Sequence, residues 1–428
     1  MKTPSRADRS APAARRPLAA SLLAAALLSA APSVLAAGGL SFDTAQALAA
    51  ERAPMLAARQ ASLDAATQLR SSAEALPDPR LTLGVDNLPI GGPDRYSFTA
   101  DPMTQRTIGW MQEVPNAAKR AARAQGAGAR AEREQVLLDA ERLGVQREVA
   151  AAWAARYYAE RQLELFQALE SENRLLRETV ASRVAAGKAM PADATMARQD
   201  AVMLADRRDE LQRARTQAQA TLKRWLGDDA AQPLAGAPPP LALDPQALRG
   251  AIERQPDLLV FDPMARMTQA EAAELVAAKG GDWNWQVSYS RRDPAYGDMV
   301  AFQIGIELPL WGAKRQDPQI AAKLKDAERI GAEREDLLRK RREEIDLQLA
   351  EIDETGAKLE RLQATSVPLA GERVALALAA YESGRGDLAA VLAARRERAE
   401  LGLRALDLES RAFALRARLN YLTSEQKP

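Results

Sequence analysis

The chain has 428 residues, with 59 Lys and Arg against 58 Asp and Glu, and it contains no Cys and no His. This near-neutral balance, with charges of both signs interleaved, gives no indication of a nucleic-acid partner. The missing Cys and His exclude thiol nucleophiles, His-based acid–base catalysis, disulfides and nearly all soft-metal sites. We therefore expect no catalytic residue, no cofactor and no metal site.

The first 36 residues have the pattern of a secretory signal peptide. Several basic residues precede an apolar run over 18–28, and small or modest-sized residues follow at 34–36. No Cys follows the predicted cleavage point, which excludes a lipid anchor on the mature N-terminus. No later run of about 18 apolar residues predicts a membrane-spanning helix. The mature protein is expected to be exported, and either soluble or embedded in a membrane as a β-barrel.

Three landmarks occur twice in the same order, which indicates an internal duplication. The segment 51–54 (Glu-Arg-Ala-Pro) recurs at 253–256 (Glu-Arg-Gln-Pro), 112–115 (Gln-Glu-Val-Pro) at 306–309 (Ile-Glu-Leu-Pro), and 184–187 (Val-Ala-Ala-Gly) at 381–384 (Tyr-Glu-Ser-Gly). The second landmark is followed by a Lys-Arg pair in both halves: Lys119-Arg120 and Lys314-Arg315. We predict two repeats, 37–230 and 244–428, joined by a proline-rich linker at 231–243. Each repeat would run helix, strand pair, very long helix, second helix.

Apolar and polar residues alternate in two segments of each repeat. The expected strands cover about 79–87, 104–114, 282–291 and 299–308. In the last of them Val300, Phe302 and Ile304 share one face. Alternation over about nine residues suits a membrane-spanning strand, with lipid on one side and water on the other. An ordinary half-buried hairpin in a soluble sheet is the alternative.

Four Trp residues lie in or beside these segments and are candidates for membrane-interface girdles: Trp110, Trp283, Trp285 and Trp311. The alternative is that aromatic residues simply favour strands. Four strands cannot close a barrel, because about eight is the practical minimum. A membrane-spanning form of this chain must therefore oligomerise, and three copies would supply twelve strands.

Long stretches without proline predict helices too long for an ordinary globular domain. A helix over most of the stretch between Pro115 and Pro191 would approach about 100 Å in length. In the second repeat, apolar residues recur every seven positions, as in a coiled-coil seam: Leu338, Ile345, Ile352 and Leu359. Such helices need lateral neighbours, because a single amphipathic rod would leave its seam exposed.

The duplicated order of these motifs resembles that of the TolC-type outer-membrane efflux proteins, over essentially the whole mature chain. The resemblance implies a mainly α protomer with a small β part. Three protomers would form a long α-helical barrel joined to a 12-stranded outer-membrane β-barrel, with four strands from each. It also implies a location in the outer membrane, no enzymatic activity, and two partners: a periplasmic adaptor and an inner-membrane pump of the resistance-nodulation-division (RND) type.

The stretches 86–97 and 103–113 resemble the heavy-metal, CzcC/CusC-like branch of this family, whose members accompany pumps that export metal cations. The chain shows no metal-ligand cluster of its own, so selectivity would belong to the pump and the adaptor. Drug efflux and type I protein secretion are alternatives within the channel class. Outside that class, the alternatives are a soluble periplasmic coiled-coil adaptor and a secreted hydrolase that uses Glu113 and Glu307 as a carboxylate pair.

A conduit needs a gate, which we expect at the two helix turns farthest from the membrane, 187–191 and 384–387. Family members often carry acidic residues just beyond the second turn, but here the matching positions are Ala390 and Ala393. A threefold ring of the nearby Asp387, or of Asp193 in the first repeat, would favour cations. Both aspartates could instead cap helices. The candidate gate residues are Gly187, Lys188, Asp193, Gly384, Arg385 and Asp387; Lys188 and Arg385 could pair with the carboxylates across protomers or be simple surface charges.

Overall fold

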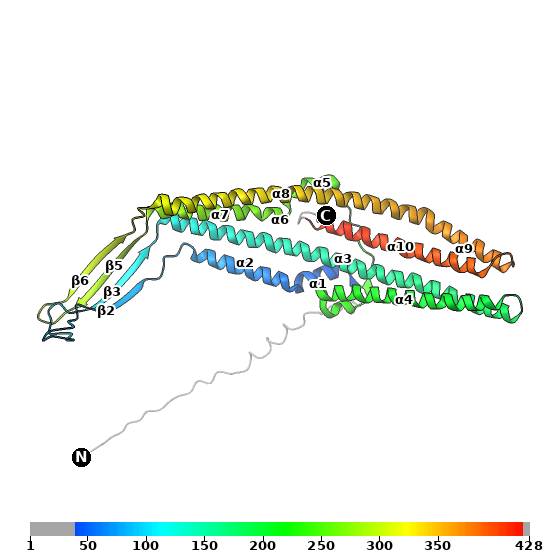
Figure 1. The fold of residues 1–428 in the computed structure, drawn as a ribbon, viewed down its shortest axis with the longest axis horizontal. Helices are drawn as coiled ribbons and strands as arrows, with labels where there is room; N and C mark the ends of the chain where they lie inside the picture. The colour runs from blue at the N-terminus through cyan, green and yellow to red at the C-terminus, as the bar shows by residue number, and fades with distance from the viewer. Residues whose placement is uncertain (1–38, 423–428) are drawn as a thin grey trace, which may run out of the picture. The chain divides into compact units, whose positions relative to one another are not determined.

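The computed structural model describes residues 39–422, and the predicted signal peptide over 1–36 lies outside the described residues. Residues 40–422 belong to one unit, in which a four-stranded sheet leads into long helices that lie side by side (Figure 1). Within residues 39–422, no helix is both long enough and apolar enough to cross a membrane.

The first half begins with a short strand and two helices, continues through a strand pair, and ends in a helical hairpin. Its elements are β1 (Leu40–Ser41), α1 (Phe42–Arg52), α2 (Pro54–Ser72), β2 (Arg80–Asp86), β3 (Gln105–Val114), α3 (Ala117–Ala185) and α4 (Pro191–Leu226). Ser41 caps α1 by accepting a hydrogen bond from the Thr44 amide at 3.1 Å. Pro54 and Pro191 start α2 and α4, because proline is tolerated in the first helical turn.

The second half repeats this order after a connecting segment. Its elements are the 3₁₀ turn Gly227–Ala231, β4 (Leu234–Ala235), α5 (Pro245–Gly250), the 3₁₀ turn Ile252–Arg254, α6 (Pro256–Leu259), α7 (Phe261–Ala277), the 3₁₀ turn Ala278–Gly280, β5 (Trp283–Arg291), β6 (Met299–Ile306), α8 (Gly312–Arg361), a π-helical turn (Leu362–Ser366), α9 (Val367–Glu382) and α10 (Leu388–Asn420). Asp244 caps α5 by accepting from the amide of Gln246 at 2.8 Å.

The sheet has the strand order β2-β3-β5-β6, and every neighbouring pair is antiparallel. The central pair joins the two halves of the chain, with Val114 opposite Trp283 and Arg106 opposite Arg291. All four strands fall inside the segments that alternation in the sequence marks. The outer edges of β2 and β6 have no partner strand within residues 39–422.

The long helices form two sets of neighbours. Near the sheet, α3 packs against α2 and α7, and α7 packs against α8. Farther along, α4, α3, α10 and α9 lie in that order, so α4 and α9 are the edge helices of the protomer (Figure 1). Helix α3 takes part in both sets because its 69 residues span about 100 Å.

The predicted seven-residue seam is interrupted before α9. Leu338, Ile345 and Ile352 are buried against the short helices α5 and α6 and the end of α10. At 362–366 the helix widens into a π turn, in which the Val367 amide donates to the Leu362 carbonyl five residues earlier. Pro368 follows at once, and proline disrupts a regular α-helix by clashing with the carbonyl four residues earlier. In α9 the buried residues Val374 and Tyr381 lie one position beyond those that the seven-residue repeat predicts.

A buried cluster around Trp153 ties the start of the described chain to the segment between the repeats. The Trp153 indole is fully buried, donates to the Leu40 carbonyl at 3.1 Å, and meets the Phe42 ring edge-on at 5.7 Å. Strand β1 pairs in parallel with β4, which lies inside the predicted linker 231–243. Arg156 is also buried and donates to the Gln232 carbonyl at 2.8 Å. This part of the linker is therefore held firmly in place.

Candidate membrane-facing sheet and helix turns

The strand register gathers the apolar side chains of all four strands onto one face of the sheet. One row across the strands contains Leu81, Trp110, Val287 and Phe302, and the next contains Leu83, Ile108, Tyr289 and Val300. These side chains are exposed, with Phe302 at 63% and Val300 at 71%. Exposed apolar area on this scale marks a surface that contacts a partner or a membrane.

The opposite face of the sheet is polar and carries small residues. A typical row contains Thr82, Gly109 and Ser288. A Cβ atom at Gly109 would lie 2.5 Å from the Thr82 hydroxyl, so neighbouring side chains already occupy that space. Towards the loop end, the Thr107 hydroxyl donates to the Asp86 carboxylate at 2.6 Å. The sheet is therefore apolar on one side and polar on the other, as lipid and water would require.

Three of the four Trp residues lie at different levels of the apolar face, and the fourth follows the sheet. Trp110 is in the middle row, well away from either end of the strands. Trp283 and Trp285 occupy the two rows nearest the helices, and Trp311 lies just before α8 begins. The residues suited to the helix-side border of a membrane are thus Trp283, Trp285 and Trp311.

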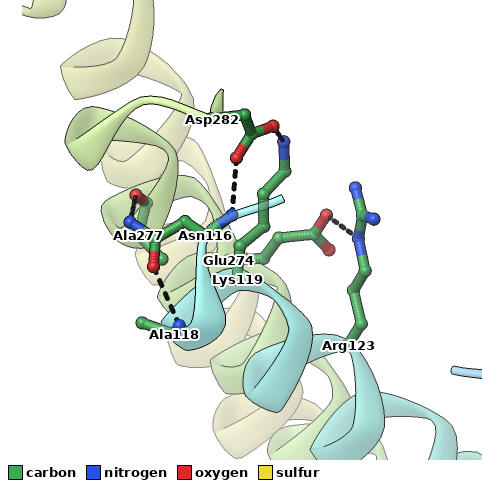
Figure 2. A network of polar contacts seen from close by, with 7 residues as sticks. All are labelled: Asn116, Ala118, Lys119, Arg123, Glu274, Ala277 and Asp282. Carbon is green, nitrogen blue, oxygen red and sulfur yellow. Dashed lines mark hydrogen bonds and ion pairs between the residues drawn. The ribbon is translucent and has the colours of Figure 1, made fainter. Parts of the chain in front are cut away.

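A polar cluster joins the sheet to the helices (Figure 2). The Asp282 carboxylate, one residue before β5, accepts from Lys119 Nζ at 2.6 Å and from the Asn116 amide at 2.9 Å. The Asn116 side chain caps α3 by accepting from the Ala118 amide at 2.8 Å. Partial burial alone would raise the pKa of Asp282, but the hydrogen bonds from Lys119 and Asn116 and the neighbouring positive charge hold that pKa below its usual value.

Gly281 lies beside this cluster and has a left-handed backbone, with φ of +68°. A Cβ atom here would overlap the carbonyl oxygen of Glu307, whose amide donates to the Asp282 carbonyl at 2.8 Å. Glycine is therefore needed both for its backbone conformation and for the close approach of the chain after β6. Glu113 and Glu307 belong to strand segments that β5 separates, so they do not form an adjacent carboxylate pair.

The two helix turns have matching backbone geometry. Gly187 and Gly384 follow α3 and α9 with φ of +68° and +72°. The Lys188 amide donates to the Arg183 carbonyl at 2.8 Å, and the Arg385 amide donates to the Ala380 carbonyl at 2.9 Å. Each turn thus ends its helix with a left-handed glycine and a backbone hydrogen bond to the preceding turn.

Both candidate gate aspartates act as helix caps in the protomer. Asp387 accepts from the Ala390 amide at 2.7 Å, and Asp193 accepts from the Met190 amide at 3.1 Å. Within residues 39–422 neither Lys188 nor Arg385 forms an ion pair. Within the same described range, no group of three or more Asp or Glu residues could hold a metal ion.

The two turns contact each other through a pair that the sequence analysis did not identify. The Arg183 guanidinium lies over the Tyr381 ring, 4.6 Å from its centroid. Tyr381 is 5% exposed, and burial, with the nearby Asp193 carboxylate, raises the pKa of its phenol despite the opposing charge of Arg183. A signal was present, because Tyr381 opens the second copy of the duplicated landmark (184–187 and 381–384), but its partner is almost 200 residues away.

A second polar contact between the helical hairpins was also missed. Asp200 on α4 is buried, accepts from the Asn173 amide group at 2.6 Å and lies 3.3 Å from Arg396 on α10. Burial raises the pKa of the Asp200 carboxyl, although Arg396 and Asn173 oppose that shift. Nearby, Arg398 pairs with Glu172 at 2.8 Å. In the sequence these residues are indistinguishable from the solvated charges around them.

No protein-family model and no curated protein matches the sequence. Solved structures do match over most of the chain. A membrane protein from Pseudomonas aeruginosa has a TM-score of 0.76 at 18% identity, over 89% of this chain and 90% of the other. CusC, described as undergoing transmembrane channel formation, has a TM-score of 0.74 at 16% identity, over 89% and 92%.

The outer-membrane protein VceC from Vibrio cholerae has a TM-score of 0.73 at 19% identity, over 89% of this chain and 95% of the other. The outer-membrane channels OprN and CmeC match with TM-scores of 0.74 and 0.72. At these identities the likeness concerns the fold. Residues 39–422 therefore have the fold of the outer-membrane channels of the TolC type that the sequence motifs resemble.

Proposed function

We propose that this protein is a passive channel of the outer membrane, working as a trimer in a tripartite efflux system. Substrate would pass from an inner-membrane RND pump and a periplasmic adaptor through the helices and the sheet to the exterior. The observation that carries this proposal is the register, which puts apolar residues of four strands on one exposed face of a sheet that leads into long helices, of which α3 is about 100 Å long. A soluble periplasmic adaptor would have to expose such an apolar face to water.

The unpartnered surfaces of the protomer support a trimer. The outer edges of β2 and β6 need partner strands, and three copies would give the twelve strands of a closed barrel. The edge helices α4 and α9 also carry exposed apolar side chains, among them Val202, Leu369 and Leu376. These would be covered if α4 of one copy packed against α9 of the next, extending the row of helices into a second barrel.

The membrane assignment is tested by two neighbouring substitutions on β6. Phe302→Arg places a charge on the apolar face and is expected to cost about 2–4 kcal/mol if that face meets lipid. Gln303→Arg is the matched control, because its side chain is on the polar face. Assembly of each variant is measured as the fraction of trimer in detergent by native mass spectrometry. Equal assembly of the two variants would refute a lipid-facing sheet.

We also propose that the carboxylates of Asp193 and Asp387 form cation-favouring rings at the helix turns of the trimer. Their capping role is compatible with this, since capping uses part of each carboxylate and leaves its charge in place. Asp387→Ser separates the two roles, because serine retains the cap and removes the charge. We expect weaker block by multivalent cations in planar bilayers for Asp387→Ser and for Asp193→Ala. Block and conductance equal to wild type in both would leave these residues as caps alone.

We propose heavy-metal cations as the cargo, on the basis of the resemblance of 86–97 and 103–113 to the heavy-metal branch. A strain that lacks the gene should become sensitive to copper, zinc or cadmium salts and keep its resistance to hydrophobic drugs. The complemented strain and a strain complemented with Phe302→Arg are the controls. Sensitivity to drugs alone would instead assign the channel to drug efflux, and loss of a secreted protein would assign it to type I secretion.

A further inference from the structure

The duplicated Lys-Arg pair has different surroundings in the two halves of the chain. In the first half, Lys119 is paired with Asp282 at 2.6 Å and Arg120 donates to the Glu74 carbonyl at 3.5 Å. In the second half, Lys314 and Arg315 are exposed, and neither forms an ion pair within residues 39–422. The first pair is thus used inside the protomer, and the second is available to an outside anion.

An exposed apolar segment leads directly into the second pair. Leu308, Leu310 and Trp311 lie between β6 and α8, with Leu310 and Trp311 each 73% exposed. The segment follows Ile306, which ends β6, lies opposite Trp283 on the apolar face of the sheet and is also exposed. Leu-Trp side chains followed by Lys-Arg are typical of the border between lipid tails and headgroups.

A cleft that Arg315 lines, next in sequence to Lys314, has room and polar groups for a headgroup. It measures about 460 Å³ and is lined by Lys119, Glu271, Glu274, Arg315, Gln316 and Lys323. Its two carboxylates are already paired, Glu271 with Lys323 and Glu274 with Arg123, each at 2.6 Å. Arg315 is left without a carboxylate. The Gln316 side chain is 8% exposed, and its buried Oε1 accepts no hydrogen bond within the described residues.

We propose that this segment is a binding site for an anionic phospholipid of the membrane leaflet on the helix side of the sheet. Leu308, Leu310 and Trp311 would enter the lipid, while Lys314 and Arg315 bind the headgroup phosphate. Gln316 offers an acceptor to a hydroxyl group of a glycerol headgroup. The proposal rests on the membrane insertion argued above. It assigns the second Lys-Arg pair to lipid and the first to the junction between sheet and helices.

The test uses the full chain, purified in a non-ionic detergent and followed by native mass spectrometry. The probe is dioctanoyl phosphatidylglycerol. Dioctanoyl phosphatidylcholine supplies the same tails without net charge, and inorganic phosphate supplies the charge without tails. Because each basic residue near a membrane surface contributes about 1 kcal/mol, we expect the double variant Lys314→Gln/Arg315→Gln to bind phosphatidylglycerol about 30-fold more weakly.

The matched control is Lys340→Gln/Arg342→Gln, a second exposed pair on α8 that forms no ion pair within residues 39–422 and has no comparable apolar segment beside it. It should bind phosphatidylglycerol as wild type does. Trp311→Ser should weaken the binding of both lipids by a similar factor.

Equal phosphatidylglycerol affinity in wild type and the Lys314/Arg315 variant would overturn the proposal. Displacement of the lipid by inorganic phosphate would also overturn it, by identifying a soluble-anion site. Loss of the trimer in the double variant would overturn it too, and would assign the segment to a contact between copies. Failure of the wild type itself to form a detergent-bound trimer would overturn the proposed channel function as well, and the same spectra distinguish that case.

Discussion

Removing the Asp282 carboxylate should loosen the junction between the sheet and the helices. Asp282 and Lys119 have side chains only 12% and 19% exposed, and Asp282→Ala would leave Lys119 Nζ and the Asn116 amide without their acceptor. Removing one partner of a fully buried ion pair costs about 3–5 kcal/mol. Since some exposure remains here, we expect a loss of about 2–4 kcal/mol in the free energy of unfolding.

The neighbouring Arg123–Glu274 pair is the internal control, because it also starts from α3, joins it to α7, and is more exposed, at 41% and 31%. Glu274→Ala should cost no more than about 1 kcal/mol. Urea unfolding in detergent, followed by circular dichroism, measures both losses. A double-mutant cycle of Asp282→Ala with Lys119→Met isolates the coupling energy between the two side chains. The pKa of Asp282 is lowered in the folded state. Its contribution is therefore present above the unfolded pKa of about 3.9 and disappears as the pH falls through the folded value. Equal losses for Asp282→Ala and Glu274→Ala at pH 7 would refute this reasoning.

Three further substitutions test other parts of the structure. Asp200→Asn should stabilise the protein more at neutral pH than in acid. The folded pKa of Asp200 is raised, so its ionised form destabilises the folded state above that pKa, and this penalty is gone below about pH 4. Unfolding midpoints of the wild type and the variant across this pH range measure the difference. A constant difference at every pH would contradict it. Gly281→Ala should lower the free energy of unfolding by about 2 kcal/mol more than Gly297→Ala does. Both glycines have positive φ, but only Gly281 faces a backbone carbonyl, that of Glu307. The denaturant midpoints of the two variants are compared, and similar midpoints would show that the Glu307 contact is unimportant. Tyr381→Leu keeps the bulk of the side chain and removes the cation–π contact with Arg183, which holds the two turns together with about 1–2 kcal/mol. Bilayer recordings should show a higher open probability than for Tyr96→Leu, a loop variant that loses an exposed cation–π contact of the same length. Unchanged gating would place Tyr381 outside the gate.

The elements that could be predicted from the sequence are those set by local pattern. Alternating residues marked the positions of the four strands, because each strand has one face that is mainly apolar. Proline-free stretches bounded by Pro115 and Pro191 marked α3 and its turn. The glycines at 187 and 384 marked both helix ends, since a left-handed residue ends a helix in a recognisable way.

The contacts that could not be predicted join residues far apart in the chain. Asp282 with Lys119, Tyr381 with Arg183 and Asp200 with Arg396 are each separated by more than 150 residues. A charged residue on a long helix gives no local sign of whether it faces solvent or another helix. The level of Trp110 on the sheet likewise depends on the register of β3 with β5, which alternation alone does not define.

The π turn at 362–366 has a consequence for how this chain can change in evolution. Each residue added to or removed from an α-helix rotates everything beyond it by about 100°. The extra residue in this turn sets the angular position of α9, and so it decides that Tyr381 meets Arg183. A homologue with one residue fewer at this point would remain fully helical, but a different face of α9 would pack against the neighbouring helices. Length variation should therefore be tolerated in the sheet loops and rejected in this stretch.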